Sequence, residues 1–273
     1  MTILRNENNT MYKKLLILGG THEAYSLVEK LISNFPSDKL RIISSLAGST
    51  SKPKLPSGEV ICGGFGGVLG LKNYLIKNNI SFVINATHPF ANKISQNAQS
   101  VTNELGISYF RLSRPPWEKI SGDKWIEVPD VEAAANQLIE SKSQLLKNAY
   151  KKNIFLSIGS RELHYFKKCN SHNFFIRTVE KATTVNSPAK SIFFYERGPF
   201  NLQNELNLLK KNAIKLLVSK NSGGVHTYPK IEASRKLNIP VIMIRRPKLS
   251  PKIVSYSLNE AIFWISKKID MQK

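Results

Sequence analysis

The first half of the chain alternates short apolar runs with longer segments in which apolar residues recur at helical spacing. Short apolar runs between polar turns are typical of strands that are buried on both faces. Strands are predicted at Lys14–Leu18, Arg41–Ser45, Glu59–Cys62, Ser81–Asn85 and Ser108–Leu112, and helices at Thr21–Asn34, Val68–Asn78 and Pro89–Leu105. This alternation predicts βαβ units and a parallel sheet.

The proline pair in Arg114-Pro115-Pro116-Trp117 forbids regular structure and predicts a domain boundary. A second series follows, with strands predicted at Lys124–Val128, Ile154–Ile158, Ile192–Tyr195, Ile214–Ser219 and Pro240–Ile244, and helices at Val131–Tyr150, Asn201–Asn212, Tyr228–Leu237 and Leu258–Ile269. Residues between 159 and 191 are less regular. We therefore predict two Rossmann-like α/β domains, residues 13–113 and 114–273, whose parallel sheets face a central cleft. Residues 1–12 are expected to form a disordered extension.

Composition adds a strong positive charge, because 40 Lys and Arg stand against 19 Asp and Glu, a formal charge of +21. Such an excess indicates a polyanionic partner, unless it only reflects lysines spread along the chain. The two cysteines form no CxxC pair or metal pattern, so we expect a reduced cytoplasmic protein without a metal. We recognise no signal peptide, and no apolar stretch approaches the roughly 20 residues that span a bilayer.

The turn after the first strand carries candidate cofactor chemistry in Leu18-Gly19-Gly20-Thr21-His22-Glu23-Ala24. Gly19, Thr21 and Ala24 match the spacing of G-x-G-x-x-G/A, in which glycine lets the backbone approach a pyrophosphate at a helix N-terminus. Thr21 replaces the middle glycine and is expected to add a hydroxyl donor. By itself the match is weak, and an ordinary turn is the alternative.

The turns after the second and third strands extend this candidate site. A dinucleotide site that prefers NAD usually has an acidic residue after the second strand. Here Ser45, Ser49 and Lys52 offer hydroxyls and a cation, which favours the 2′-phosphate of NADPH over an ordinary serine-rich loop. Gly63–Gly67, which includes Gly64, Phe65 and Gly66, suits a backbone lying flat against a ligand. A flexible surface loop is the alternative.

The segment Asn85–Ala91 follows the fourth strand, at the sheet edge where parallel α/β proteins bind ligands. We expect the Thr87 hydroxyl to cap the next helix and Pro89 to occupy its first turn. His88 and Phe90 would then lie at the mouth of a crevice. The alternative is a well-capped helix with a surface histidine.

Three glycine-containing turns follow strands in the second half, at Ser157–Leu163, Glu196–Phe200 and Ser219–Gly224. Each has a cation in it or beside it, so together they could form a basic, amide-lined basin for carboxylates. The candidate residues are Arg197, Lys220, Asn221, Ser222 and Gly223. A solvated surface is the alternative for any single one of these cations.

Taken together, these turns resemble the precorrin-6A reductase family of cobalamin biosynthesis, over nearly the whole chain after residue 13. The resemblance rests on Ile17–Thr21 with Glu23-Ala24, Ser45–Gly48, Gly63–Gly67, Ala86–Ala91, Arg114-Pro115 with Trp117, Arg197–Phe200, Lys220–Gly224 and Arg246-Pro247. Two positions depart from the family pattern. Asn85 stands where the family usually has Asp, and Ser49 stands where it often has Arg.

The resemblance implies an oxidoreductase that uses NADPH to reduce a CH–CH bond of precorrin-6A or its cobalt form. It places the pyrophosphate at Gly19–Thr21, the adenosine end at Ser45, Ser49 and Lys52, and the nicotinamide between Gly63–Gly67 and Thr87–Phe90. The polycarboxylate macrocycle would face the basic turns of the second domain. His88 is a candidate proton donor, beside water or a substrate carboxyl.

As partners, the resemblance implies this macrocycle and transient contacts with neighbouring pathway enzymes, but no nucleic acid and no membrane. Two rival functions follow from the residues alone. An NADP-linked small-molecule reductase of the extended Rossmann type would need a Tyr-x-x-x-Lys pair. A basic nucleic-acid-binding protein would need a recognition helix or a basic stripe with aromatics. Neither signature is visible in the sequence.

Overall fold

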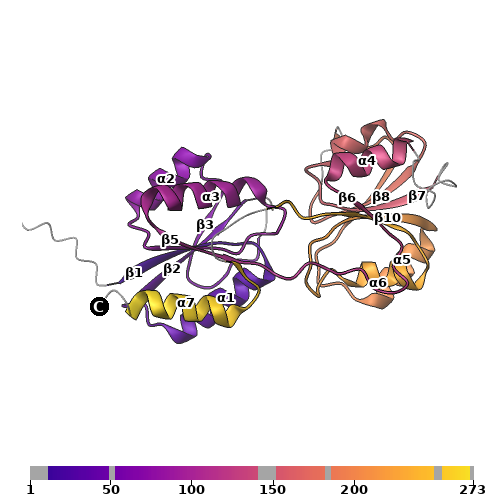
Figure 1. Ribbon diagram of the computed structural model, residues 1–273. Coiled ribbons are helices and arrows are strands. Elements are labelled where there is room, and N and C mark those ends of the chain that lie inside the picture. The colour runs from indigo at the N-terminus through magenta and orange to yellow at the C-terminus, as the bar shows by residue number, and fades with distance from the viewer. Residues whose placement is uncertain (1–11, 49–52, 141–151, 182–185, 249–253, 271–273) are drawn as a thin grey trace, which may run out of the picture. The chain divides into compact units, whose positions relative to one another are not determined.

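The computed structural model describes residues 12–48, 53–140, 152–181, 186–248 and 254–270. The chain forms two compact units, each built on its own six-stranded parallel sheet (Figure 1). Unit 1 comprises residues 1–114 and 249–273, and unit 2 comprises residues 115–248. Each sheet is covered on both faces by helices, as the buried apolar strands require.

Unit 1 contains one sheet with the strand order β12-β5-β4-β1-β2-β3. Helices α1 and α7 cover one face, and α2 and α3 cover the other (Figure 1). The strands are β1 (Lys13–Leu18), β2 (Leu40–Leu46), β3 (Glu59–Cys62), β4 (Phe82–Asn85), β5 (Ser108–Leu112) and β12 (Val254–Ser255). The helices are α1 (His22–Asn34), α2 (Val68–Lys77), α3 (Asn92–Leu105) and α7 (Leu258–Asp270). The order reverses between β1 and β4, where doubly wound sheets bind ligands.

Unit 2 contains the second sheet, with the order β6-β11-β10-β7-β8-β9. Its strands are β6 (Trp125–Val128), β7 (Asn153–Ser157), β8 (Asn173–Thr178), β9 (Ser191–Tyr195), β10 (Ile214–Lys220) and β11 (Val241–Ile244). Its helices are α4 (Val131–Glu140), the 3₁₀ helix η2 (Leu163–Lys168), α5 (Leu202–Lys211) and α6 (Pro229–Lys236). Helices α5 and α6 pack on one face around a core that includes Trp117 and Trp125.

The C-terminal segment corrects the predicted domain boundaries. We expected the second domain to run from residue 114 to 273, but the chain returns to unit 1 after residue 248. There β12 pairs with β5, and α7 packs on the face that carries α1. Ala261 and Ile265 of α7 are fully buried against β1 and β4 residues. The apolar spacing of this helix was visible in the sequence, but its destination was not.

Three further elements differ from the prediction. Helix η2 and strand β8 occupy the stretch between residues 159 and 191 that we left irregular, and β8 (Asn-Phe-Phe-Ile-Arg-Thr) includes the buried Arg177. Helix α3 begins at Asn92 rather than Pro89. The predicted extension at residues 1–12, apart from Tyr12, and the predicted helical residues 141–150 lie outside the described residues. Within the described parts, no helix is long and apolar enough to cross a membrane.

Candidate active site

The turn between β1 and α1 lies at the carboxyl edge of the unit 1 sheet. Gly20 has φ +98°, a conformation that favours glycine, and a Cβ placed there would meet no protein atom within 4 Å. Gly19 has a different surrounding, since its Cβ would lie 3.3 Å from the Cβ of Ala24. Gly19 therefore allows α1 to pack closely on β1, and Gly20 is the residue whose backbone lies open to a ligand.

Thr21 is the N-cap of α1, and this corrects its expected role as a ligand donor. Its hydroxyl donates to the Ala86 carbonyl oxygen at 2.7 Å and accepts from the Ala24 backbone N–H at 3.2 Å. Its only proton is therefore used within the protein. The side chain ties the β1 turn to the β4 turn, and what remains for an anion is the backbone at the start of α1.

The turns after β2 and β3 lie next to each other. The Gly63 N–H donates to the Leu46 carbonyl oxygen at 2.9 Å, and a Cβ on Gly48 would lie 3.3 Å from Gly63. Ser45 is buried, with its carbonyl accepting from the Gly19 N–H at 2.9 Å. Ser49 and Lys52 lie outside the described residues. Gly64 and Gly66 are exposed and open to a ligand.

The Gly63–Gly67 turn differs from its predicted placement in two ways. Strands β1 and β2 separate it from the β4 turn, so strand order puts it on the side of the β2 turn rather than beside Thr87–Phe90. The ring of Phe65 packs edge-on against Tyr74 at 5.1 Å, within the core under α2. Phe65 therefore anchors the turn, and its carbonyl approaches Gly70 so closely that a Cβ there would lie 1.6 Å away.

The β4 turn is held by a buried polar cluster that sequence reasoning missed. Arg111 of β5 is 3% exposed and donates to the carbonyl oxygen of Asn85 at 3.2 Å and to the Asn85 Oδ1. It also donates to the hydroxyl and the carbonyl oxygen of Thr87, each at 3.0 Å. A charged residue within the buried strand Ser108–Leu112 was the signal that could have revealed this cluster.

Asn85 completes the cluster with its whole amide. Oδ1 accepts from the Thr87 N–H at 3.1 Å and from the Thr87 hydroxyl at 2.8 Å. Nδ2 donates to the Ser95 hydroxyl at 3.0 Å and to the Tyr109 hydroxyl at 2.9 Å. Both the oxygen and the nitrogen of the Asn85 amide are thus used within the protein. The Thr87 hydroxyl does not cap α3, whose N-cap is Ala91 without a side-chain bond.

His88 and Phe90 are half-buried in the same turn, with ring centroids 5.8 Å apart. The Phe90 backbone N–H donates to Nδ1 of His88 at 3.3 Å. A nitrogen that accepts this bond carries no proton, so the arrangement favours the neutral ring with its proton on Nε2. A neutral imidazole is a much weaker acid than an imidazolium, so this arrangement makes His88 a weaker candidate for the proton donor.

In unit 2, the predicted basic basin is more constrained than expected. Lys220, at the end of β10, forms an ion pair with Glu162 of the adjacent β7 turn. Asn221 is occupied on both sides by Trp117: its Oδ1 accepts from the Trp117 N–H at 2.8 Å, and its Nδ2 donates to the Trp117 carbonyl oxygen at 2.9 Å. Asn221 therefore fixes the chain after the proline pair instead of offering its amide to a ligand.

Arg246, after β11, clamps the remainder of the β10 turn. It donates to the carbonyl oxygens of Asn221 at 2.8 Å and Ser222 at 2.9 Å. Ser222 is buried, and a Cβ on Gly223 would lie 2.2 Å from both Arg246 and the Pro115 carbonyl oxygen. Ser222 and Gly223 are therefore structural.

Arg197 follows β9 and is exposed. The turn that contains Arg197 contacts the loop after β10 beyond Gly223, where the Phe200 N–H donates to the His226 carbonyl oxygen at 3.0 Å. Arg177 of β8 holds both ends of this turn: it forms an ion pair with Glu196 at 2.9 Å, and its guanidinium lies 4.1 Å from the centre of the Phe200 ring. Arg177 also pairs at 2.8 Å with buried Glu205, where burial raises the pKa of the carboxyl.

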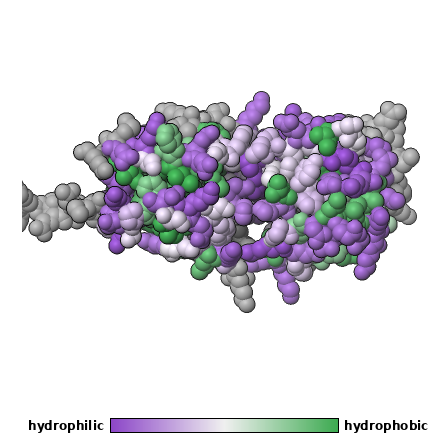
Figure 2. Space-filling view, turned by 90° about the horizontal axis from the view of Figure 1, so that it is seen from below, coloured by the Kyte–Doolittle hydropathy of each residue, from purple (hydrophilic) through white to green (hydrophobic). Residues whose placement is uncertain are grey.

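Lysines gather at the opposite, amino edge of the unit 2 sheet, which the sequence did not predict. Lys152, Lys210 and Lys215 line an open groove of about 890 Å³ there. Burial and the neighbouring Lys215 lower the pKa of Lys152. Seen from below, hydrophilic residues cover most of the surface, with smaller hydrophobic patches between them (Figure 2).

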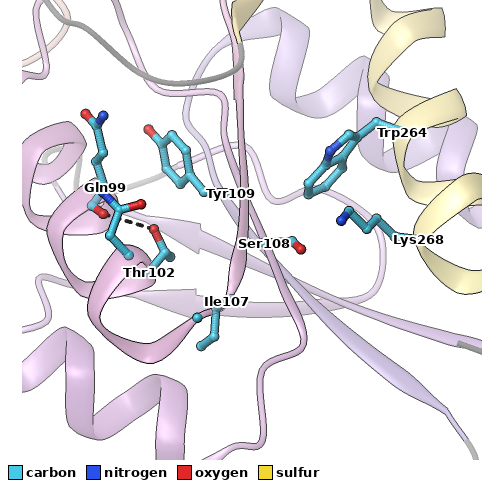
Figure 3. Close-up of a pocket in the computed structure, with 9 residues that line it drawn as sticks. Gln99, Thr102, Ile107, Ser108, Tyr109, Trp264 and Lys268 are labelled. Carbon is cyan, nitrogen blue, oxygen red and sulfur yellow. Dashed lines mark hydrogen bonds between the residues drawn. The ribbon is translucent and has the colours of Figure 1, made fainter. Parts of the chain in front are cut away.

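A smaller pocket of about 260 Å³ lies at the amino end of β5 in unit 1 (Figure 3). Its lining includes Tyr109, Gln99 of α3, and Trp264 and Lys268 of α7. Tyr109 belongs to both this pocket and the Asn85 cluster, and burial raises the pKa of its hydroxyl. The pocket itself lies away from the carboxyl edge that carries the predicted cofactor residues.

The carboxyl edge of unit 1 fits a dinucleotide on two observations. Gly20 offers open backbone at the switch point between β1 and β4. The hydroxyl of Ser44, near the end of β2, is buried without a hydrogen-bond partner in the described parts of the chain. A buried orphan hydroxyl beside the edge suits a polar ligand, since buried polar groups are normally bonded.

Comparison with known proteins is consistent with this geometry. The family model for precorrin-6x reductase CbiJ/CobK matches residues 14–266. Precorrin-6A reductase of Sinorhizobium sp is 36% identical over 258 residues, covering 93% of this chain and 94% of that protein. The cobalt-precorrin-6A reductase of Priestia megaterium is 27% identical over 203 residues, covering 70% of this chain and 75% of that protein.

A solved structure, the CobK precorrin-6A reductase, resembles the whole chain. It aligns with a TM-score of 0.83 and 32% sequence identity, over 93% of this chain and 96% of that one. Sequence and fold thus agree over both units. The chain belongs to the precorrin-6x reductase CbiJ/CobK family.

Proposed function

We propose that this chain reduces precorrin-6A, or its cobalt form, to the corresponding precorrin-6B with NADPH, as a step of cobalamin biosynthesis. Family membership supports an oxidoreductase acting on a CH–CH bond. The observation that carries the cofactor part is the open Gly20 backbone at the switch point of the unit 1 sheet. When bound, the nicotinamide supplies a hydride, and the protein supplies orientation and electrostatics.

The residues of unit 1 divide between the two ends of the dinucleotide. Gly20 and the first turn of α1 would hold the pyrophosphate through backbone N–H groups. Ser44 and Ser45, with Ser49 and Lys52, would hold the adenosine end, and strand order adds Gly64 and Gly66 to this end. Thr87, His88 and Phe90 would border the nicotinamide, because β4 lies on the other side of β1.

The reduction also needs a proton, and three sources remain open. The neutral ring that the Phe90 N–H favours makes His88 a weak acid. We therefore rank water or a substrate carboxyl above His88 as the donor. His88→Gln should then lower kcat only a few-fold, whereas loss of a general acid typically costs about 10²–10⁴-fold.

In unit 2, the exposed Arg197 and the paired Lys220 are the residues that we propose for the substrate carboxylates. A positive edge would attract and orient a polycarboxylate macrocycle. Asn221, Ser222 and Gly223 would act indirectly, by shaping the turn that presents Lys220. We place the enzyme in the cytoplasm, where two free cysteines are the norm.

The decisive test is two incubations of the purified chain. One contains NADPH and precorrin-6A, and the other contains NADPH and cobalt-precorrin-6A. Oxidation of NADPH together with a product heavier by two hydrogens is the expected result. The form that reacts identifies the substrate. NADPH oxidation with simple ketones but with neither macrocycle would support the small-molecule reductase instead, and NADPH-independent binding of DNA would support the nucleic-acid protein.

Cofactor choice is tested separately by titration. NADPH should bind more tightly than NADH, because no acidic residue follows β2 to accept the 2′-hydroxyl. Lys52→Ala should weaken NADPH binding and leave NADH binding unchanged. Equal affinity for both dinucleotides in the wild-type protein would contradict the assignment.

A further inference from the structure

Among the residues that the structure describes, Arg111 is a buried cation without a carboxylate partner. The residue is 3% exposed, and burial lowers the pKa of its guanidinium. The acceptors of Arg111 among the described residues, on Asn85 and Thr87, are neutral. Within the described ranges, no Asp or Glu forms an ion pair with it. Neutral acceptors satisfy its N–H groups but do not cancel its charge, and an uncompensated buried charge is costly.

The Arg111 charge lies near the edge of the sheet to which the nicotinamide end of the cofactor is assigned. Arg111 lies at the end of β5, beside the end of β4, and holds the Thr87 backbone and hydroxyl in place. The β4 turn is on the side of the sheet to which strand order assigns the nicotinamide end. NADPH and NADP⁺ carry the same phosphates, but the oxidised nicotinamide ring adds one positive charge.

We propose that Arg111 is a determinant of cofactor affinity that favours the reduced dinucleotide over the oxidised one. The guanidinium orients the β4 turn through Thr87, and its uncompensated charge attracts the negative dinucleotide while opposing a positive ring. This inference rests on the proposed NADPH dependence. Its consequence for turnover is tighter binding of the reacting form and easier release of the spent one.

Asn85→Asp tests the charge while changing few contacts. Its carboxylate can accept every bond that Oδ1 now accepts, and the Tyr109 hydroxyl can turn to donate to it. The Ser95 hydroxyl can donate to it only by giving up its bond to the Ala91 carbonyl oxygen. The variant gives Arg111 an internal counter-ion. We expect weaker NADPH binding by a factor on the order of ten, the scale of one nearby partly buried charge, and a smaller loss for NADP⁺.

Arg111→Lys separates position from charge. The ammonium keeps the charge but cannot reproduce the planar fork that reaches Asn85 and Thr87 together. Both dinucleotides should therefore weaken by a similar factor, with their affinity ratio unchanged. Asn103→Asp on the exposed surface of α3 is the control, because it makes the same charge change near the amino edge of the sheet. It should bind both dinucleotides like the wild type.

The measurement is fluorescence titration of each purified variant with NADPH and with NADP⁺, together with urea unfolding of the cofactor-free protein. The inference is overturned if Asn85→Asp binds NADPH like the wild type, or if it loses both forms by an equal factor. It is also overturned if Arg111→Lys changes the affinity for neither dinucleotide. This second variant tests the inference even if Asn85→Asp fails to fold. Failure of the folded wild type to bind NADPH at all would instead refute the proposed function.

Discussion

At the residue scale, Gly20 is the position at which the cofactor assignment is most exposed to test. Its φ of +98° is strained for any other residue, and the space beside it is open within the protein. Gly20→Ala should cost about 1–2 kcal/mol of stability through this strain. Because the added methyl group faces the open edge, it should also weaken NADPH binding by about tenfold or more, measured by titration.

Gly106→Ala is the matched control for this variant. Gly106 ends α3 in the left-handed region with φ +67°, and a Cβ there also meets nothing within 4 Å. The strain is therefore similar, but the position is at the other edge of the sheet. If both variants bind NADPH equally well, the dinucleotide does not lie on the β1 turn.

Single residues show how far sequence reasoning reached at this site. The spacing of Gly19, Thr21 and Ala24 correctly marked a tight strand-to-helix turn, but spacing cannot tell which glycine faces outward. The Thr21 proton goes to Ala86, a residue 65 positions away, and this partner exists only in the folded chain. Likewise, the role of Arg111 depends on Asn85, which lies opposite it on the paired strand β4 and is 26 positions away in the sequence.

At the scale of elements, the β7 and β10 turns of unit 2 form one charged unit. Lys220 is 14% exposed and its partner Glu162 is 37% exposed, so the pair lies at the surface edge and is partly screened. If Lys220 contacts a substrate carboxylate, Lys220→Ala should raise KM about tenfold, the loss of one charge-assisted bond. Glu162→Gln should lower KM, because it removes a carboxylate that competes with the substrate for the ammonium.

Opposite signs in the two variants distinguish a substrate contact from a structural ion pair. Lys236→Ala serves as control, since Lys236 pairs with Glu232 on the exposed side of α6. Initial rates at varied macrocycle concentration provide KM for all three variants. An increase of similar size for Lys220→Ala and Glu162→Gln would mean that the pair only stabilises the fold.

Elements were predictable where apolar periodicity was strong. The strands and helices of unit 1 up to β5 follow the predicted ranges closely, because each strand is an apolar run bounded by a turn. The β8 strand escaped prediction although it contains the apolar run Phe174–Ile176; in the fold, Glu205 and Glu196 neutralise the charge of Arg177, which follows this run. The early start assigned to α3 overlooked that Thr87 bonds to Asn85 and Arg111 instead of capping a helix.

At the scale of the whole molecule, the two halves of the sequence are not the two units of the structure. The βα rhythm and the proline pair identified the first crossing between units, at residues 114 and 115. Nothing local distinguishes α7 from a helix of unit 2. Its placement depends on which sheet has an uncovered face, and this is a property of the assembled fold.

The return of α7 to unit 1 predicts that the C-terminus controls cofactor binding. Ile265 is fully buried among residues of β1, α1, β4 and β5, and the neighbouring Trp264 ring lies 5.2 Å from that of Phe110. Ile265→Ala should cost about 2–5 kcal/mol of unit 1 stability, the usual range for a buried large-to-small change. Urea unfolding should show this loss, and NADPH binding should fail at lower urea concentrations.

Phe263→Ala is the matched comparison, because Phe263 lies on the same helix but is 59% exposed. It should change stability by about 0.5 kcal/mol or less, as surface substitutions usually do. Hydrogen exchange can assign the loss, since Ile265→Ala should speed exchange in β1 and β4 while β7 and β10 keep their protection. Faster exchange in β7 and β10 instead would mean that α7 supports unit 2, as the sequence alone suggested.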